Sequence, residues 1–150
     1  ALPIYAQMIQ VSLVPKQYVE SCWAEIVPFM ERAAEFTYGR YTADDILDSL
    51  MDYDHVLWVA IDEGKIKGAV VTNFVTYPKR KLLCMSFCGG EDLHEWKAPM
   101  LALLQRFARD TGCDGIEATA RRGWAKIFKN DGFQDHWVTF ELPVEGAQHG

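Results

Sequence analysis

The first third of the chain carries apolar residues at two different spacings. A short apolar run over Met8–Val14 predicts a strand. Over Pro15–Ala34 the apolar residues recur every three or four positions, which predicts a helix that Pro28 should kink or divide. A second helix is expected to begin near Thr42, because Asp45, three residues on, completes a capping box. The chain should therefore open with one strand and two helices.

The middle of the chain changes to runs rich in β-branched and aromatic residues. The runs His55–Ile61, Ile66–Tyr77 and Leu82–Cys88 predict three strands joined by turns. Gly89-Gly90 is expected to end the last of them, and a long helix should then run from about Asp92 to Asp110. The stripe that this helix should bury consists of Trp96, Met100, Leu103, Leu104 and Phe107.

The last part of the chain alternates short elements. Ile116–Ala120 predicts a strand, Gly123–Asn130 a short helix, and Phe133–Leu142 a final strand or strand pair. No repeat or linker divides the chain, so we expect a single domain over residues 1–150, with a core at about 8–142 and a tail at 143–150. The order β-α-α-β-β-β-α-β-α-β predicts a mixed α/β (α+β) layer fold in which helices cover both faces of a central sheet.

Composition narrows the class of protein. The 150 residues are 49% hydrophobic, which excludes wholesale disorder, and 21 acidic against 15 basic residues give a net charge of −6. The acidic surplus argues against nucleic acid as a partner, and no apolar run reaches the roughly 18 residues that cross a membrane. Four cysteines are too few for a disulfide scaffold, so we expect a reducing, cytoplasmic location.

Two stretches resemble the GNAT superfamily of N-acetyltransferases. The stretch from Trp58 to Ala69 looks like the second and third strands of the family, with a turn and a strand glycine. The stretch from Gly112 to Phe133 is similar to the fifth strand, the fourth helix and the terminal Gly-Phe of the family. Within it, Arg121-Arg122-Gly123-Trp124 resembles short GNAT-like proteins of tailed bacteriophages. The resemblance covers about residues 8–142 and implies a mostly antiparallel sheet flanked by helices.

The resemblance implies acetyl-CoA as cofactor, in a gap between the fourth and fifth strands. The family holds its pyrophosphate on amides at the start of the third helix, at the motif Gln/Arg-x-x-Gly-x-Gly/Ala. One register sets this motif on Glu95–Met100, which has no glycine and contains Pro99, a residue without an N–H. The other register uses Cys88, Gly89 and Gly90, which we take as candidate cofactor-binding residues. There the following Glu91-Asp92 would repel phosphate, and a tight turn is the alternative explanation of the glycines.

A basic cluster is the second part of the implied cofactor site. Arg121, Arg122 and Lys126, followed by Lys129, lie on or just before the predicted short helix. The resemblance implies that such residues contact the adenosine phosphates of CoA. The alternative is a solvated helix face, and the sequence favours neither.

The catalytic residues of the family are only partly matched. The family often uses a tyrosine to protonate the leaving thiolate, and Phe128 stands at that place in this chain. Aminolysis also needs a base, and the candidates are His55, Glu117 and His136. Glu117 alternates with apolar residues on the predicted fifth strand, so it faces either the gap or solvent. His55 could equally be a polar residue at a strand edge, and His136 a surface residue.

The cysteines do not predict a metal site. Cys84 and Cys88 lie four residues apart on one strand, about 13 Å by rise alone, which is too far for a single ion. Core packing is the better interpretation of both. We therefore expect no metal.

Three functional hypotheses follow. The first is an acetyl-CoA-dependent N-acyltransferase acting on a small-molecule or protein amine, and the acidic charge hints at a cationic acceptor. The second is a catalytically degenerate GNAT-like phage protein with a structural or host-protein-binding role. The third is a domain that binds CoA without transferring a group. Many members of the family are dimers, so a homodimer is also implied.

Overall fold

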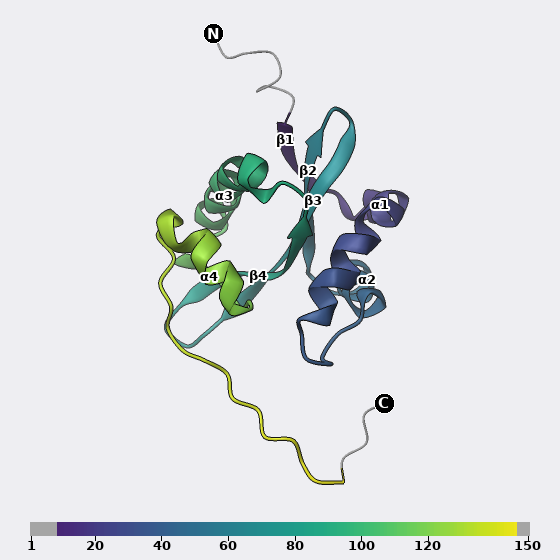
Figure 1. Cartoon of the computed structure of the whole chain (residues 1–150). Coiled ribbons are helices and arrows are strands. Elements are labelled where there is room, and N and C mark those ends of the chain that lie inside the picture. Colours follow the sequence, from purple (N-terminus) through teal and green to yellow (C-terminus); the bar gives the residue numbers. More distant parts are fainter. Residues whose placement is uncertain (1–8, 147–150) are drawn as a thin grey trace. The chain divides into compact units, whose positions relative to one another are not determined.

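The computed structural model describes residues 9–146 as two compact units, one ending at Thr119 and the other starting at Ala120 (Figure 1). The elements of the first unit are β1 (Ile9–Val14), α1 (Lys16–Glu35), α2 (Ala43–Asp52), β2 (Val56–Asp62), β3 (Lys65–Thr76), β4 (Lys81–Gly90), α3 (Leu93–Asp110) and β5 (Gly115–Ala118). The second unit contains α4 (Arg122–Phe128) and the single 3-10 turn η2 (Lys129–Asp131).

The first unit is built on one five-stranded sheet with the strand order β1-β2-β3-β4-β5. The pairs β1–β2, β2–β3 and β3–β4 are antiparallel, whereas β5 lies parallel to β4. The parallel pair requires a crossover, which α3 supplies. The mixed, mostly antiparallel sheet predicted from the sequence is thereby confirmed.

Helices cover the two faces of this sheet. The helices α1 and α2 pack on one face, where Ile26, Met30, Ile46 and Leu50 join alternate residues of β2 and β3 in the largest apolar cluster. The helix α3 covers the other face, where the Phe107 ring meets the Trp58 ring edge-on at 4.9 Å. The two helix layers lie on either side of the strands in Figure 1.

Local signals in the sequence formed as expected at two helix ends. Thr42 accepts a hydrogen bond from the amide of Asp45, whose carboxylate in turn accepts from the amide of Thr42. Gly112, with φ of 77°, follows α3 in the left-handed conformation that glycine tolerates best. Pro28, however, does not divide α1, which runs unbroken from Lys16 to Glu35. The buried residues Ile26 and Met30 on either side hold that turn in the core.

Two other sequence predictions were wrong. Gly89 and Gly90 do not end β4 but belong to it, paired with Ala69 and Gly68 of β3. The predicted last strand, Phe133–Leu142, is absent, because residues 133–144 have no ladder partner in the described part of the chain. A period-two pattern forms a strand only where a neighbouring strand can accept its hydrogen bonds.

The second unit has a small aromatic centre. The ring of Phe128, at the end of α4, is buried and lies 5.6 Å from the Trp124 ring and 5.0 Å from the Phe133 ring. Beyond it the apolar side chains of the extended segment are exposed, including Phe140 at 91% and Leu142 at 90%. This unit therefore buries few of its own apolar residues.

Candidate functional site

The strand β4 has two halves with different neighbours. Its first half, Leu82–Met85, pairs with the whole of β5, whereas its second half continues to Gly90 and has no ladder partner on that side among residues 9–146. A bulge separates the halves, because Thr72 pairs with Met85 while Val71 pairs with Phe87. Ser86 is thus the extra residue, and a bulge of this kind bends a strand and re-aims its side chains. A free length of β4 edge results beyond the end of β5.

A cluster of polar side chains lies beside this bulge, on three neighbouring strands. Asn73 of β3 pairs with Cys84 of β4, which pairs with Glu117 of β5. The Ser86 hydroxyl donates a hydrogen bond to Oδ1 of Asn73. The Tyr77 hydroxyl, from the turn after β3, lies 2.8 Å from Oε1 and 3.1 Å from Oε2 of Glu117. These five residues are called the polar row below.

The electrostatics of the polar row favour proton handling over nucleophilic attack. The hydrogen bond to Glu117, followed by burial and by the negative charge of Glu117, raises the pKa of Tyr77, so the phenol stays a donor at neutral pH. Burial is the largest cause that raises the pKa of the Cys84 thiol. A neutral thiol is a poor nucleophile. Glu117 therefore remains the candidate base of the row that the sequence predicts.

His55 lies immediately before β2, away from Glu117. Val56 pairs with Thr72, so His55 and Asn73 are the next residues on neighbouring strands. Three strand spacings of about 4.8 Å each separate β2 from β5, so His55 lies about 14 Å from Glu117 across the sheet. Burial lowers the pKa of His55, more than the nearby Asp54 raises it, and its Nδ1 has no hydrogen-bond partner among the described residues. The two candidate bases thus cannot act on the same proton.

The glycines at the end of β4 serve close packing. A Cβ on Gly89 would lie 2.7 Å from the carbonyl oxygen of Phe29 in α1. A Cβ on Gly90, whose φ is 155°, would lie 2.6 Å from Cα of Gly68. Gly68 in turn lies under Trp96, whose ring would come within 2.3 Å of an added Cβ. These contacts explain the glycines without any ligand.

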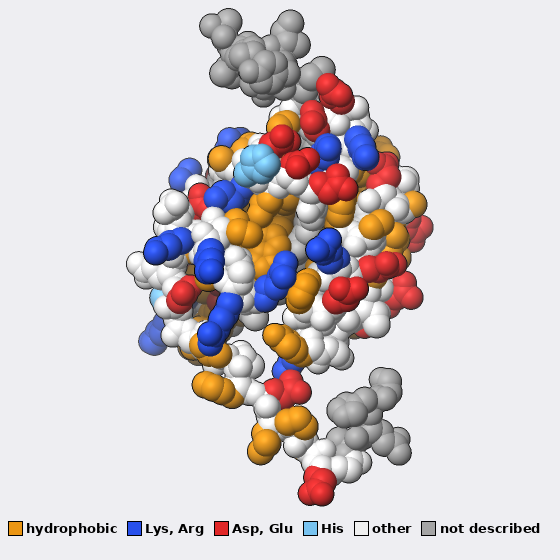
Figure 2. All heavy atoms as spheres, in the orientation of Figure 1, with side chains coloured by type: hydrophobic (Ala, Val, Ile, Leu, Met, Phe, Trp, Pro, Cys, Tyr) orange, Lys and Arg blue, Asp and Glu red, His pale blue; other side chains and the backbone are white. Residues whose placement is uncertain are grey.

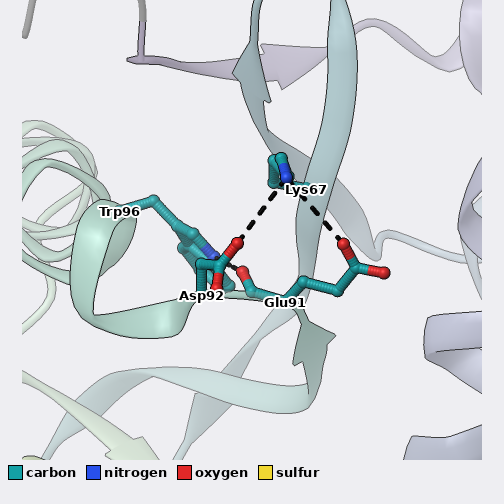
Figure 3. A network of polar contacts seen from close by, with 4 residues as sticks. All are labelled: Lys67, Glu91, Asp92 and Trp96. Carbon is teal, nitrogen blue, oxygen red and sulfur yellow. Dashed lines mark hydrogen bonds and ion pairs between the residues drawn. The ribbon is translucent and has the colours of Figure 1, made fainter.

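The passage from β4 into α3 is held by polar contacts that Figure 3 shows. Nζ of Lys67, on β3, lies 3.9 Å from a carboxylate oxygen of Glu91 and 3.6 Å from one of Asp92. The indole N–H of Trp96 donates to the carbonyl of Glu91 over 2.9 Å. Asp92 takes the left-handed conformation, with φ of 52°, directly before the helix. Only Glu91 and Asp92 thus separate strand from helix.

The charge of this passage is unfavourable for the pyrophosphate of a coenzyme A. A shallow hollow beside the start of α3 is lined by Ile9, Ala60, Ile61, Asp62, Lys67, Glu95 and Trp96. Asp and Glu side chains gather at this end of the molecule in Figure 2. Two carboxylates of the β4–α3 passage already engage Lys67. A phosphate at a helix start is stabilised by positive potential, which these carboxylates oppose.

The other predicted cofactor residues remain predictions. Cys88 lies on the free half of β4, and burial raises the pKa of its thiol to about 12. Arg121, Arg122 and Lys126 are exposed at the start and along α4 of the second unit. These three residues belong to the second unit, whereas Gly89 and Gly90 belong to the first.

Among residues 9–146, no group of three or more His, Cys, Asp or Glu side chains could hold a metal ion. In the same stretch, no helix combines the length and the apolar character needed to span a bilayer.

Sequence reasoning missed several residues of these sites. Asn73 and Ser86 meet through the β3–β4 register and its bulge, and Tyr77 meets Glu117 of β5, and no local pattern indicates either contact. Lys67 could have been predicted from the sequence. It precedes the strand glycine Gly68, and pairing of β3 with β4 places it beside Glu91 and Asp92.

Comparison with known proteins supports the fold by structure alone. No model of a protein family and no curated protein sequence matches the chain. A GNAT family acetyltransferase of Staphylococcus aureus superposes with a TM-score of 0.66 and 14% identity, covering 91% of this chain and 99% of that one. The aminoglycoside N-acetyltransferase AAC(6')-Iy in complex with CoA gives 0.68 and 12%, covering 91% and 95%. A ribosomal-protein-alanine N-acetyltransferase of Brucella melitensis gives 0.67 and 14%, covering 91% and 99%. The chain thus has the GNAT fold.

Proposed function

We propose that this protein is an N-acyltransferase-like enzyme that transfers an acyl group to an amine, with Glu117 as its base. The observation that carries the proposal is the polar row beside the point where β5 ends and β4 continues alone. The fold neighbours named as aminoglycoside and ribosomal-protein acetyltransferases support the same reaction class. Fold likeness leaves the acceptor open, and the site must identify it.

The chain contributes proton handling to this reaction. An acyl thioester supplies the acyl group, a bond forms between the amine nitrogen and the carbonyl carbon, and the C–S bond breaks. Glu117 takes the proton that the amine gives up, and the leaving thiolate is protonated from solvent. Tyr77 holds the carboxylate through its hydroxyl, at 2.8 Å, and so orients it. A carboxylate held in this way is suited to a cationic acceptor.

Charge on the α1–α2 layer favours that class of acceptor. Residues 16–54 contain nine acidic residues (Glu20, Glu25, Glu31, Glu35, Asp44, Asp45, Asp48, Asp52 and Asp54) and three basic ones (Lys16, Arg32 and Arg40), so 3 − 9 gives −6. The whole chain also sums to −6, so the remaining residues are neutral overall. A negative helix layer on the face that carries the polar row attracts amines over long range.

The second candidate function is a GNAT-fold protein without catalysis, with a structural or protein-binding role. The observation that favours it is the filled β4–α3 passage, where Trp96 is only 2% exposed. In this case Glu117 and Tyr77 would form an ordinary surface hydrogen bond. A phage origin would fit this role.

Measurements of thioester binding and of turnover distinguish the enzyme from the non-catalytic protein. The full chain is heated with and without acetyl-CoA and S-acetylpantetheine, and then assayed for thiol release with polyamine, aminoglycoside and N-terminal peptide acceptors. A thioester at 100 times its Kd should add about 2.7 kcal/mol to the free energy of unfolding. Thiol release that depends on the amine supports the enzyme. Unchanged melting with both thioesters and no thiol release would contradict it and favour the non-catalytic role.

A further inference from the structure

The strand β1 lies at one margin of the sheet and has a neighbour on one side only. All six of its residues, Ile9–Val14, pair with β2, and β1 has no ladder partner on its outer side among residues 9–146. The N–H and C=O groups that point to this outer side are therefore open to a further strand. Such a row of backbone groups is a template for pairing with another chain.

The strand β1 lacks the features that usually protect an edge. Its sequence, Ile-Gln-Val-Ser-Leu-Val, contains no charged residue, no proline and no glycine. Its register with β2 runs through all six residues without a bulge. Natural edge strands are commonly very short, charged, bulged or interrupted by proline. A neutral six-residue strand rich in β-branched residues is instead typical of segments that pair readily.

The opposite margin of the sheet is protected in the ways that β1 is not. There β5 has only four residues, Gly115–Ala118, and one of them is the charged Glu117. The adjacent strand β4 is interrupted by the bulge at Ser86. Pairing with a further strand is therefore favoured at β1 and opposed at the β5 margin.

The side chains of β1 match those of a second copy of the same strand. Ile9 and Val11 are half-buried on the face where α3 packs, and Leu13 on that face is 38% exposed. Gln10 and Ser12 alternate with them and are exposed. Because alternate residues of a strand point to opposite faces, an added strand with the same alternation continues both faces and covers Leu13.

The charges at the two ends of β1 are complementary. Lys16 follows the strand at one end. At the other end Asp62 pairs with Ile9, and Asp62 and Glu63 outnumber Lys65 in the adjoining hairpin. In an antiparallel pair of two β1 strands, the end of one strand meets the start of the other. Lys16 of each copy then lies near Asp62 of the other copy, and the two-fold symmetry produces this contact twice.

We infer that the free edge of β1 binds the β1 edge of a second copy of this chain. The two strands run antiparallel about a two-fold axis, so that two five-stranded sheets join into one continuous sheet. The inference rests on sheet pairing and charge alone and does not depend on acyl transfer. A protein without turnover leaves it standing, and a monomer with turnover overturns it without affecting the proposed enzyme.

The association itself is tested on the full chain. Sedimentation equilibrium between about 1 and 100 µM should show a species of twice the 17.1 kDa mass of the chain. Hydrogen exchange at the same concentrations should show the amides of residues 9–14 becoming protected as that species forms. A monomer throughout would overturn the inference. So would a dimer in which these amides exchange as fast as in the monomer.

A matched pair of serine variants tests the surface. Ser12 is exposed near the centre of β1, so Ser12→Lys brings two like charges together across the two-fold axis and should raise the Kd of the dimer at least about tenfold. Ser21→Lys adds the same charge at an exposed position of α1 and should change the Kd by less than about twofold. Equal effects of the two variants would contradict the β1 contact. Melting curves check that both variants are folded.

A charge swap tests the antiparallel arrangement. Lys16→Glu places like charges beside Asp62 of the second copy and should raise the Kd about three- to tenfold. Adding Asp62→Lys to the same chain makes the charges opposite again and should restore the Kd to within about twofold of the original. A swapped chain that associates as weakly as Lys16→Glu alone would contradict the arrangement.

Discussion

The two halves of β4 differ in what surrounds them, although they belong to one continuous strand. Leu82–Met85 is paired on both sides and carries Cys84 of the polar row, where Tyr77 and Glu117 meet in a hydrogen bond of 2.8 Å. The half from Ser86 to Gly90 is paired only with β3, and its end is covered by Trp96. One bulge at Ser86 separates a polar site from a tightly packed end.

In this chain the end of β5 leaves part of β4 without a ladder partner among the described residues, while two carboxylates lie at the start of α3. The unpaired length depends on where β5 stops, which is a matter of sheet pairing. A phosphate site depends on particular free amides and on charge, which a few side chains can remove. Fold likeness at 12–14% identity therefore says little about the cofactor. The predictions below test each half, from the largest effect to the smallest.

The largest effect is expected in the polar row. Glu117→Gln keeps the shape of the side chain but cannot take a proton, so amine-dependent thiol release should fall at least about 100-fold, as for loss of a general base. Asp110→Asn, at an exposed position of α3 outside the acidic α1–α2 layer, is the control and should retain the rate. An unchanged rate in Glu117→Gln would remove Glu117 from the mechanism.

The second prediction concerns the close packing of Gly68 against Trp96, which should be visible in the free energy of unfolding. Gly68→Ala would place a Cβ within 2.3 Å of the Trp96 ring, and overpacking of this kind costs about 1–3 kcal/mol of unfolding free energy. Gly115→Ala, on β5, is the control, because its nearest neighbours at 3.3 and 3.4 Å are ends of flexible side chains. Denaturant unfolding measures both. Equal stabilities would show that Trp96 does not press on Gly68.

A smaller effect should follow from removing the hydroxyl that holds Glu117. Tyr77→Phe should lower the turnover rate by about three- to tenfold, since a single oriented hydrogen bond contributes about 0.5–1.5 kcal/mol. The loss should fall on kcat and leave KM unchanged, because Tyr77 orients the carboxylate and does not bind the acceptor, and this separates positioning from a structural role. Tyr53→Phe, whose ring is 66% exposed, serves as the control. An unchanged kcat in Tyr77→Phe would contradict the positioning role.

The smallest effect concerns His55 and the pH dependence of stability. Burial lowers the pKa of His55 below its ordinary value of 6.5, so the unfolded chain binds the extra proton first as the pH falls. The contribution of neutral His55 is therefore present above pH 6.5 and is lost on acidification toward its lower folded pKa. His55→Gln should flatten the fall in Tm between pH 7 and 5 by about 1–3 °C. Parallel curves for the two proteins would show that His55 is not buried in its neutral form.

Much of the fold could be predicted from local patterns. The capping box of Thr42 with Asp45 and the glycine after α3 depend on residues a few positions apart, so the sequence contains the whole signal. The runs that became β2, β3 and β4 were recognised for the same reason. The end of β4 was predicted wrongly, because Gly89-Gly90 is a pair typical of a turn. Here the two glycines belong to the strand and allow Phe29 and Trp96 to approach its backbone closely.

The candidate site could be predicted only in part. Glu117 was identified by its alternation on the fifth strand, but its partner Tyr77 lies 40 residues earlier. His55 was named as an alternative base, yet no local pattern could place it about 14 Å from Glu117 across the sheet. The last strand was predicted from the alternation over Phe133–Leu142 and is absent from the described structure.

The sequence by itself determined the elements from β1 to α4 and their order, the acidic charge of the α1–α2 layer and the carboxylates near the start of α3. These depend on composition and on neighbours along the chain. Only the tertiary structure decided that β5 ends opposite Met85, that Ser86 bulges, and that Trp96 fills the space above two glycines. Strand register and side-chain packing bring together residues far apart in the chain, and short-range patterns carry no information about such contacts.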